Sequence, residues 1–194
     1  MDGWNLRKDI KESHNCLAYA MNTIDNELVK KCQDTVSCDI GFPQPGYAAG
    51  YGKIKGRKGC KDMVSRIWGD NPNVKATTFA LRCPSGSSKI ALIVDPSRDY
   101  HFLRLDPDGY WSHKPGAMNV SRLDASNRPI IRPDRALFIY NNNDDPLRYT
   151  KFCGYFCVPR NESLYMMSDT RVGGALLSSL GSISRRQTRR KSRD

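Results

Sequence analysis

Apolar residues recur at helical spacing near the start of the chain. Four of them follow one another at i, i+4, i+7 and i+11 and so share one helical face: Leu17, Met21, Ile24 and Leu28. Because serine is favoured at helix N-caps, Ser13 sets the start, and the pattern predicts a helix over residues 13–31. A second, shorter helix is predicted within residues 61–69.

From residue 76 onward the pattern changes to that of β-strands. Residues 89–94 form a continuous apolar run of the buried-strand type. Three more strands are predicted in stretches that contain β-branched and aromatic residues: 77–81, 135–140 and 151–158. Residues 40–60 are rich in glycine and proline and are predicted to form a long loop. A helix followed by antiparallel strands predicts an α+β fold in which the N-terminal helix packs on an antiparallel β-sheet.

Two histidines flank a strong turn signal, Asp106-Pro107-Asp108-Gly109. Proline suits the second position of a type I turn, and the glycine can take the left-handed conformation of a three-residue hairpin loop. In that register Leu103 faces His113, and His101 and His113 are diagonal neighbours on one face of the hairpin. A two-residue loop would put them on opposite faces, so the pairing of the histidines depends on the loop length.

The predicted helix start gives Cys16 a chemical role. With Ser13 as N-cap, Cys16 lies in the first turn, where unpaired N–H groups and the helix dipole favour a thiolate. Together with the two histidines it makes a candidate cysteine hydrolase site, in which Cys16 is the nucleophile, one histidine is the general base and the other orients that base. The Cys16 N–H is one oxyanion donor, and the candidates for a second are Asn15, His14 and Gln44.

Other interpretations of these residues remain open. Cys16 can be a small core residue, and the histidines can be solvated strand residues. Together, Cys16, His101 and His113 also match a Cys-His-His zinc site to which Asp99 could add an oxygen ligand, although we favour the catalytic interpretation and predict no metal or cofactor. Cys153 and Cys157 could pair or bind metal, but no second pair at zinc-site spacing accompanies them, so buried free thiols are expected.

The order of these residues resembles the NlpC-type endopeptidases of the papain-like superfamily. That family starts a helix with its cysteine and carries a Cys-His-His triad, so the resemblance implies Cys16 as nucleophile, His101 as base and His113 as orienting residue. The motifs Asn-Cys-x-Ala-Tyr-Ala and Trp-Ser-His-Lys-Pro-Gly also resemble uncharacterised proteins of large DNA viruses, phages and bacteria. The resemblance covers roughly residues 13–160 and departs from the NlpC pattern at the cysteine, where Asn15-Cys16-Leu17-Ala18 replaces Asp-Cys-Ser-Gly.

Positive charge is concentrated at the C-terminal end. Of the formal net charge of +11, the last ten residues contribute +5. Their six cationic side chains could bind nucleic acid or another polyanion: Arg185, Arg186, Arg189, Arg190, Lys191 and Arg193. We therefore expect a papain-like domain over residues 1–160 and a flexible basic tail over residues 161–194.

Compartment and function follow as expectations. The chain shows no transmembrane segment and no secretory signal, and seven cysteines without repeating spacing favour a reducing compartment, so a cytoplasmic or virion-associated protein is expected. The predicted function is hydrolysis of an amide bond, of peptide or peptidoglycan type, through a thioester. The alternative is a virion-associated structural or packaging protein that contacts other virion components and is anchored by the basic tail.

Overall fold

The computed structural model describes residues 2–168 except 34, 37, 39 and 142–145. The helices of that part are α1 (Asp2–Leu6), α2 (Lys8–Ser13), α3 (Cys16–Met21), α4 (Asn26–Gln33) and α5 (Cys60–Asp70). Its strands are β1 (Pro43–Gln44), β2 (Lys75–Thr77), β3 (Ser87–Asp95), β4 (Asp99–Leu105), β5 (Trp111–His113), β6 (Ile139–Tyr140), β7 (Leu147–Arg148), β8 (Lys151–Pro159) and β9 (Met167–Ser168). Helices and antiparallel strands together make the α+β fold that the sequence predicts.

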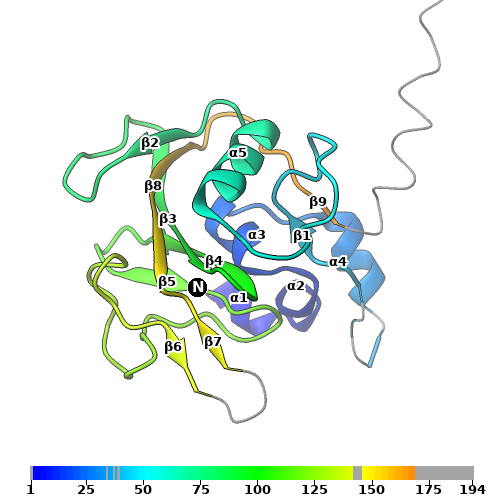
Figure 1. Ribbon diagram of the computed structural model, residues 1–194. Helices are drawn as coiled ribbons and strands as arrows, with labels where there is room; N and C mark the ends of the chain where they lie inside the picture. The colour runs from blue at the N-terminus through cyan, green and yellow to red at the C-terminus, as the bar shows by residue number, and fades with distance from the viewer. Residues whose placement is uncertain (1, 34, 37, 39, 142–145, 169–194) are drawn as a thin grey trace, which may run out of the picture.

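The described part is organised around an antiparallel five-stranded sheet in the order β2-β8-β3-β4-β5 (Figure 1). The apolar run of residues 89–94 lies in its central strand, β3, which pairs with both β4 and β8. Two small two-stranded pairs, β1-β9 and β6-β7, flank this sheet. The long β3 and β8 strands confirm the strands predicted at residues 89–94 and 151–158.

Side chains on the two faces of the sheet enter separate apolar clusters. On one face, alternate residues of β3 and β4 pack against α3 and α5, as Leu92 and Phe102 do with Leu17 and Ile67. On the other face, Ala91, Ile93 and Leu103 pack beneath Trp111 and the segment that carries Ile130 and Phe138. Since side chains alternate along a strand, neighbouring residues of β4 belong to different clusters.

The predicted helix over residues 13–31 is wrong as one element. It is divided into α3 and α4, because Asn22 takes the left-handed conformation (φ 50°) and its N–H bonds to carbonyls of the preceding turn. Ser13 is not an N-cap but the last residue of α2. Asn15 caps α3 instead, since its side-chain oxygen accepts the N–H of Ala18. The second predicted helix is confirmed as α5.

Two of the predicted strands are largely absent. Only the first residue of 77–81 lies in β2, because residues beyond it bend around the Lys89 ammonium, which bonds to the Thr78, Phe79 and Leu81 carbonyls. Only residues 139–140 of 135–140 form a strand, because the segment begins in a turn in which the Ala136 N–H bonds to the Arg132 carbonyl. Residues 40–59 form a loop as predicted, apart from β1.

The register of the histidine hairpin is confirmed. Leu103 pairs with His113, and the Asp106 N–H bonds to the Tyr110 carbonyl across the three-residue loop. Gly109 has φ 88°, the left-handed conformation that this loop requires. The turn chemistry therefore places both histidines on one face of the hairpin.

Candidate functional site

The candidate site begins with the pair of histidines on β4 and β5. His101 Nε2 lies 2.8 Å from His113 Nδ1, and His113 Nε2 lies 3.0 Å from the Leu123 carbonyl oxygen. A carbonyl can only accept, so His113 carries its proton on Nε2 and accepts on Nδ1 from the His101 Nε2–H. The pKa values of both imidazoles are lowered by burial, which keeps them neutral and leaves His101 Nδ1 as an acceptor.

The two histidines lie at a cavity of about 440 Å³ on the face of the sheet away from α3. Its walls also carry Tyr140 and Tyr149, from β6 and the β7–β8 connection, and the exposed Met118. The Tyr149 ring lies 5.5 Å from the His101 ring, and its hydroxyl donates to Asp99 at 2.7 Å. The histidines are thus fixed from two sides, by the Leu123 carbonyl and by an aromatic ring.

Cys16 lies among the residues of the opposite face. Its side chain belongs to the cluster that contains Tyr100 and Phe102, the neighbours of His101 in β4. Burial is the largest influence on the thiol and raises its pKa to about 12, although the N–H groups of Phe102 and Leu17 favour the thiolate. The structure therefore brings the two histidines together and places a protonated thiol in the core on the α3 side.

The three candidate oxyanion residues have structural partners. Asn15 caps α3 and donates to the Pro43 carbonyl at 2.8 Å. His14 bridges Ser13 and the Asp25 N–H, and Gln44 accepts from the Tyr100 hydroxyl. Each of these side chains therefore forms hydrogen bonds that hold α3 or its neighbouring segments in place.

Disulfides replace the free thiols expected from the sequence. Cys32 pairs with Cys38, Cys60 with Cys153, and Cys83 with Cys157, which leaves Cys16 as the free cysteine of the described part. Cys153 and Cys157 therefore pair neither with each other nor with a metal. Across the described residues, no group of three or more His, Cys, Asp or Glu side chains could hold a metal ion, so the Cys-His-His zinc alternative does not assemble there.

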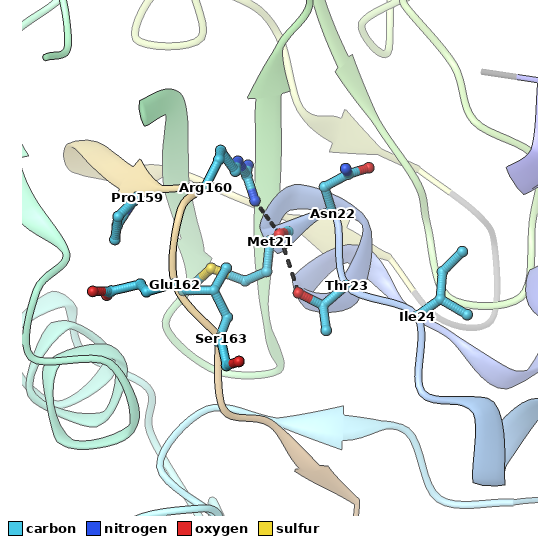
Figure 2. A pocket seen from close by; sticks show the side chains of 9 residues that line it. Met21, Asn22, Thr23, Ile24, Pro159, Arg160, Glu162 and Ser163 are labelled. Carbon is cyan, nitrogen blue, oxygen red and sulfur yellow. Dashed lines mark hydrogen bonds between the residues drawn. The ribbon is translucent and has the colours of Figure 1, made fainter. Parts of the chain in front are cut away.

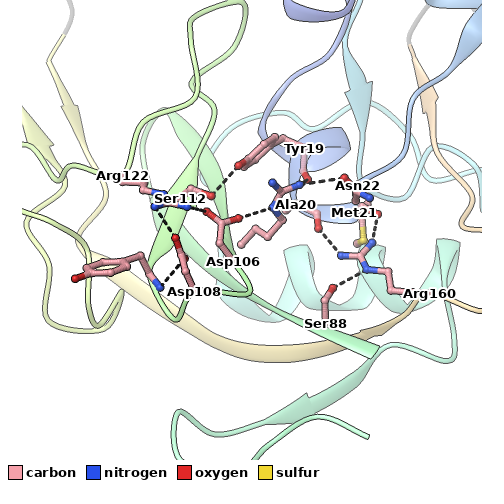
Figure 3. A network of polar contacts seen from close by, with 12 residues as sticks. Tyr19, Ala20, Met21, Asn22, Ser88, Asp106, Asp108, Ser112, Arg122 and Arg160 are labelled. Atoms are coloured by element: carbon pink, nitrogen blue, oxygen red, sulfur yellow. Dashed lines mark hydrogen bonds and ion pairs between the residues drawn. The ribbon is translucent and has the colours of Figure 1, made fainter. Parts of the chain in front are cut away.

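Two buried polar networks were missed by the sequence reasoning. In the first, the Asp106 carboxylate bonds to Arg104 and Arg122, and the Arg104 guanidinium lies 4.0 Å from the centre of the Tyr19 ring (Figure 3). In the second, Arg160 donates to the Ala20 and Met21 carbonyls at the end of α3, beside a pocket of about 560 Å³ (Figure 2). Their links to α3 could not be recognised from a local pattern, because Arg104 bonds to the Tyr19 carbonyl 85 residues away and Arg160 to the Ala20 carbonyl 140 residues away.

Lys114 forms a further buried centre. Its side chain is fully buried, and its ammonium donates to the carbonyls of Lys11, His14 and Gly116. Burial lowers its pKa to about 8. The motif Trp-Ser-His-Lys-Pro-Gly thus contributes a lysine that joins β5 to the start of α3.

Two further predictions concern the basic tail and the absence of a transmembrane segment. The basic tail residues from Arg185 to Arg193 lie outside the described residues. In the described part, no helix is long and apolar enough to span a membrane.

Comparison with known proteins gives one informative relative. No family model matches the chain, and no solved structure matches it. The insoluble matrix shell protein 1 of Ruditapes philippinarum is 33% identical over 137 residues, which cover 70% of this chain and 77% of that protein.

This similarity corrects the predicted function. Similarity to a shell matrix protein points to a structural protein, so the predicted cysteine hydrolase function and the viral or virion assignments are wrong. The cytoplasmic or virion location is also wrong, because such a matrix is extracellular and the three disulfides of the described part fit a secreted protein. The extent and identity of the match show that the chain belongs to the family of insoluble matrix shell protein 1.

Proposed function

We propose that this protein is a secreted structural component of an insoluble extracellular matrix. The observation that carries the proposal is the similarity to insoluble matrix shell protein 1 over 70% of the chain. A matrix component has to keep its shape outside the cell, without chaperones or a reducing environment. The covalent and buried polar links of this fold support that role.

Two disulfides connect segments that are distant in the sequence. Cys60–Cys153 joins the start of α5 to β8 over 93 residues, and Cys83–Cys157 joins the β2–β3 loop to the same strand over 74 residues. Closing loops of this length removes much of the conformational freedom of the unfolded chain. The two disulfides therefore stabilise the folded state, as a structural role outside the cell requires.

We also propose that the body has a papain-like arrangement that serves as a scaffold. The support is the order of elements, in which a helix begins with Cys16 and packs beside a strand that carries His101, with His113 on the next strand. In this proposal Cys16 is a core residue and the histidines are a hydrogen-bonded pair. A high thiol pKa is consistent with a scaffold that performs no thiol chemistry.

The basic tail supplies an attachment for an anionic matrix polymer in this proposal. No aromatic residue lies among its six cationic side chains, so binding would depend on charge and weaken as the salt concentration rises. Deleting residues 182–194 is expected to reduce retention at low salt and to leave the fold of the body unchanged.

A retention experiment tests the structural role. The full chain with its disulfides formed is incubated with the insoluble residue of a decalcified bivalve shell. The residue is then washed with salt and with detergent, in the absence of a reducing agent. We expect retention well above that of an unrelated basic, disulfide-bonded secreted protein of similar size. Equal and low retention of both proteins contradicts the proposal.

A further inference from the structure

Two partly exposed phenylalanine rings and the buried Tyr155 line one side of the sheet near β2 and β8, whereas the histidine pair lies on β4 and β5. Phe79, Tyr155 and Phe152 line an open groove of about 470 Å³. The ring centres of Phe79 and Tyr155 are 5.9 Å apart, and those of Phe152 and Tyr155 are 4.8 Å apart. Phe79 is 37% exposed and Phe152 36%, so both rings present apolar surface to water.

The loop that carries Phe79 is held firmly in place. Figure 1 shows the β2–β3 connection projecting beyond the sheet. The buried Lys89 ammonium donates to the carbonyls of Thr78, Phe79 and Leu81, and the Cys83–Cys157 disulfide fixes the end of the loop to β8. Exposure of the ring is thus built into the fold, and a ligand would meet a preorganised surface.

Polar groups lie directly at the edge of these rings. Arg132 and Asp134 form a two-bond ion pair, and the Arg132 guanidinium lies 4.3 Å from the centre of the Phe79 ring. The Tyr155 hydroxyl donates to the Asp134 carboxylate. Because the cation and the anion offset each other, the groove combines apolar ring faces with donors and acceptors and has no net charge of its own.

We propose that this groove binds a neutral polysaccharide chain, an inference that rests on the proposed matrix function. A pyranose ring has C–H groups on its face, which pack on aromatic rings, and hydroxyls at its edge, which both donate and accept. The rings of Phe79 and Phe152 match the face, and Arg132 and Asp134 match the hydroxyls. A proline-rich peptide is the closest alternative occupant, but proline has no N–H to donate to a carboxylate.

The test measures binding of the full oxidised protein to particles of two neutral polysaccharides, cellulose and chitin, by depletion from solution at low and high salt. We expect binding to at least one polysaccharide that changes little with salt, since stacking is not screened. Phe79→Ala and Phe152→Ala should each weaken it by about threefold to tenfold. Tyr165→Ala, which removes a 63% exposed ring outside the groove, should leave it unchanged.

Conservative variants guard against misfolding. Phe79→Tyr keeps a ring and should retain binding, whereas Phe152→Leu keeps an apolar side chain without a ring face and should weaken binding about as much as Phe152→Ala. No binding to either polysaccharide, equal effects of the groove and Tyr165 variants, or preferential binding of a soluble proline-rich peptide would overturn the inference. Retention on decalcified shell residue that is unaffected by Phe79→Ala would leave the proposed function standing and remove only this groove from it.

Discussion

His101 donates from Nε2 to Nδ1 of His113 at 2.8 Å, and this bond fixes the protonation pattern of both rings. The donor direction in this series of hydrogen bonds is set by the Leu123 carbonyl, which can only accept a hydrogen bond from His113 Nε2. Protonating either ring would place two donors against each other or add a charge to a buried site. This pair therefore requires neutral imidazoles, as the lowered pKa values of both rings indicate.

The free energy of unfolding is expected to decrease as the pH is lowered through the range in which the histidines titrate. Burial lowers the pKa of His14 from 6.5 to about 4, so between these values the unfolded chain binds the proton and the folded one does not. The stability that His14 contributes is fully present above about pH 6.5 and is lost as the pH falls toward 4, by roughly 3 kcal/mol. His101 and His113 act in the same direction.

Urea denaturation at a series of pH values measures this effect. His14→Gln should be less stable at neutral pH, because the bonds to Ser13 and the Asp25 N–H change, but its stability should depend less on pH. A variant with the same pH profile as the natural chain would show that His14 is not the titrating group.

The Cys16 thiol is expected to be unreactive in the folded protein. Its pKa of about 12 and its burial leave little thiolate at neutral pH and little access for a reagent. Iodoacetamide should label Cys16 at least about a hundredfold more slowly in the native protein than in denaturant. Fast native labelling with a midpoint near neutral pH would contradict the buried, protonated state; labelling is read by mass spectrometry of the unreduced protein.

The disulfides are expected to contribute unequally to stability. By the entropy of loop closure, Cys60–Cys153 and Cys83–Cys157 should each contribute about 4.5 kcal/mol, and Cys32–Cys38, which closes a short loop, about 2 kcal/mol. Paired Cys→Ala variants and chemical denaturation measure the differences. A ranking in which the short Cys32–Cys38 loop matters most would show that local strain or native contacts, rather than loop length, dominate.

Lys114 is expected to be essential for stability although it is a charged residue in the core. Lys114→Met keeps most of the side-chain volume but leaves the Lys11 and His14 carbonyls without their donor, each bonded at 2.6 Å. The expected loss is about 2–4 kcal/mol. Lys30→Met, on the exposed side of α4, is the matched control and should change the free energy of unfolding by less than about 0.5 kcal/mol. Similar effects of the two substitutions would refute a role for the buried ammonium.

Local patterns in the sequence predicted several elements correctly because the signals act over short distances. The apolar run of β3, the α5 helix and the hairpin register around Gly109 each depend on neighbouring residues. The division of the predicted first helix at Asn22 was missed, because apolar spacing continues across a residue that takes the left-handed conformation. The loss of strand after Thr77 was missed as well, since the ammonium that bends it comes from Lys89 on another strand.

The sequence by itself determined the α+β class, the turn that pairs His101 with His113, and the central strands, because periodicity and turn chemistry are local properties of the chain. Only the tertiary structure decided how the cysteines pair and what surrounds Cys16. Six thiols allow many pairings, and the one adopted depends on which strands and loops are brought within bonding distance. Likewise, a helix start favours a thiolate in solvent, but packing against Tyr100 and Phe102 removes the water that would stabilise the charge.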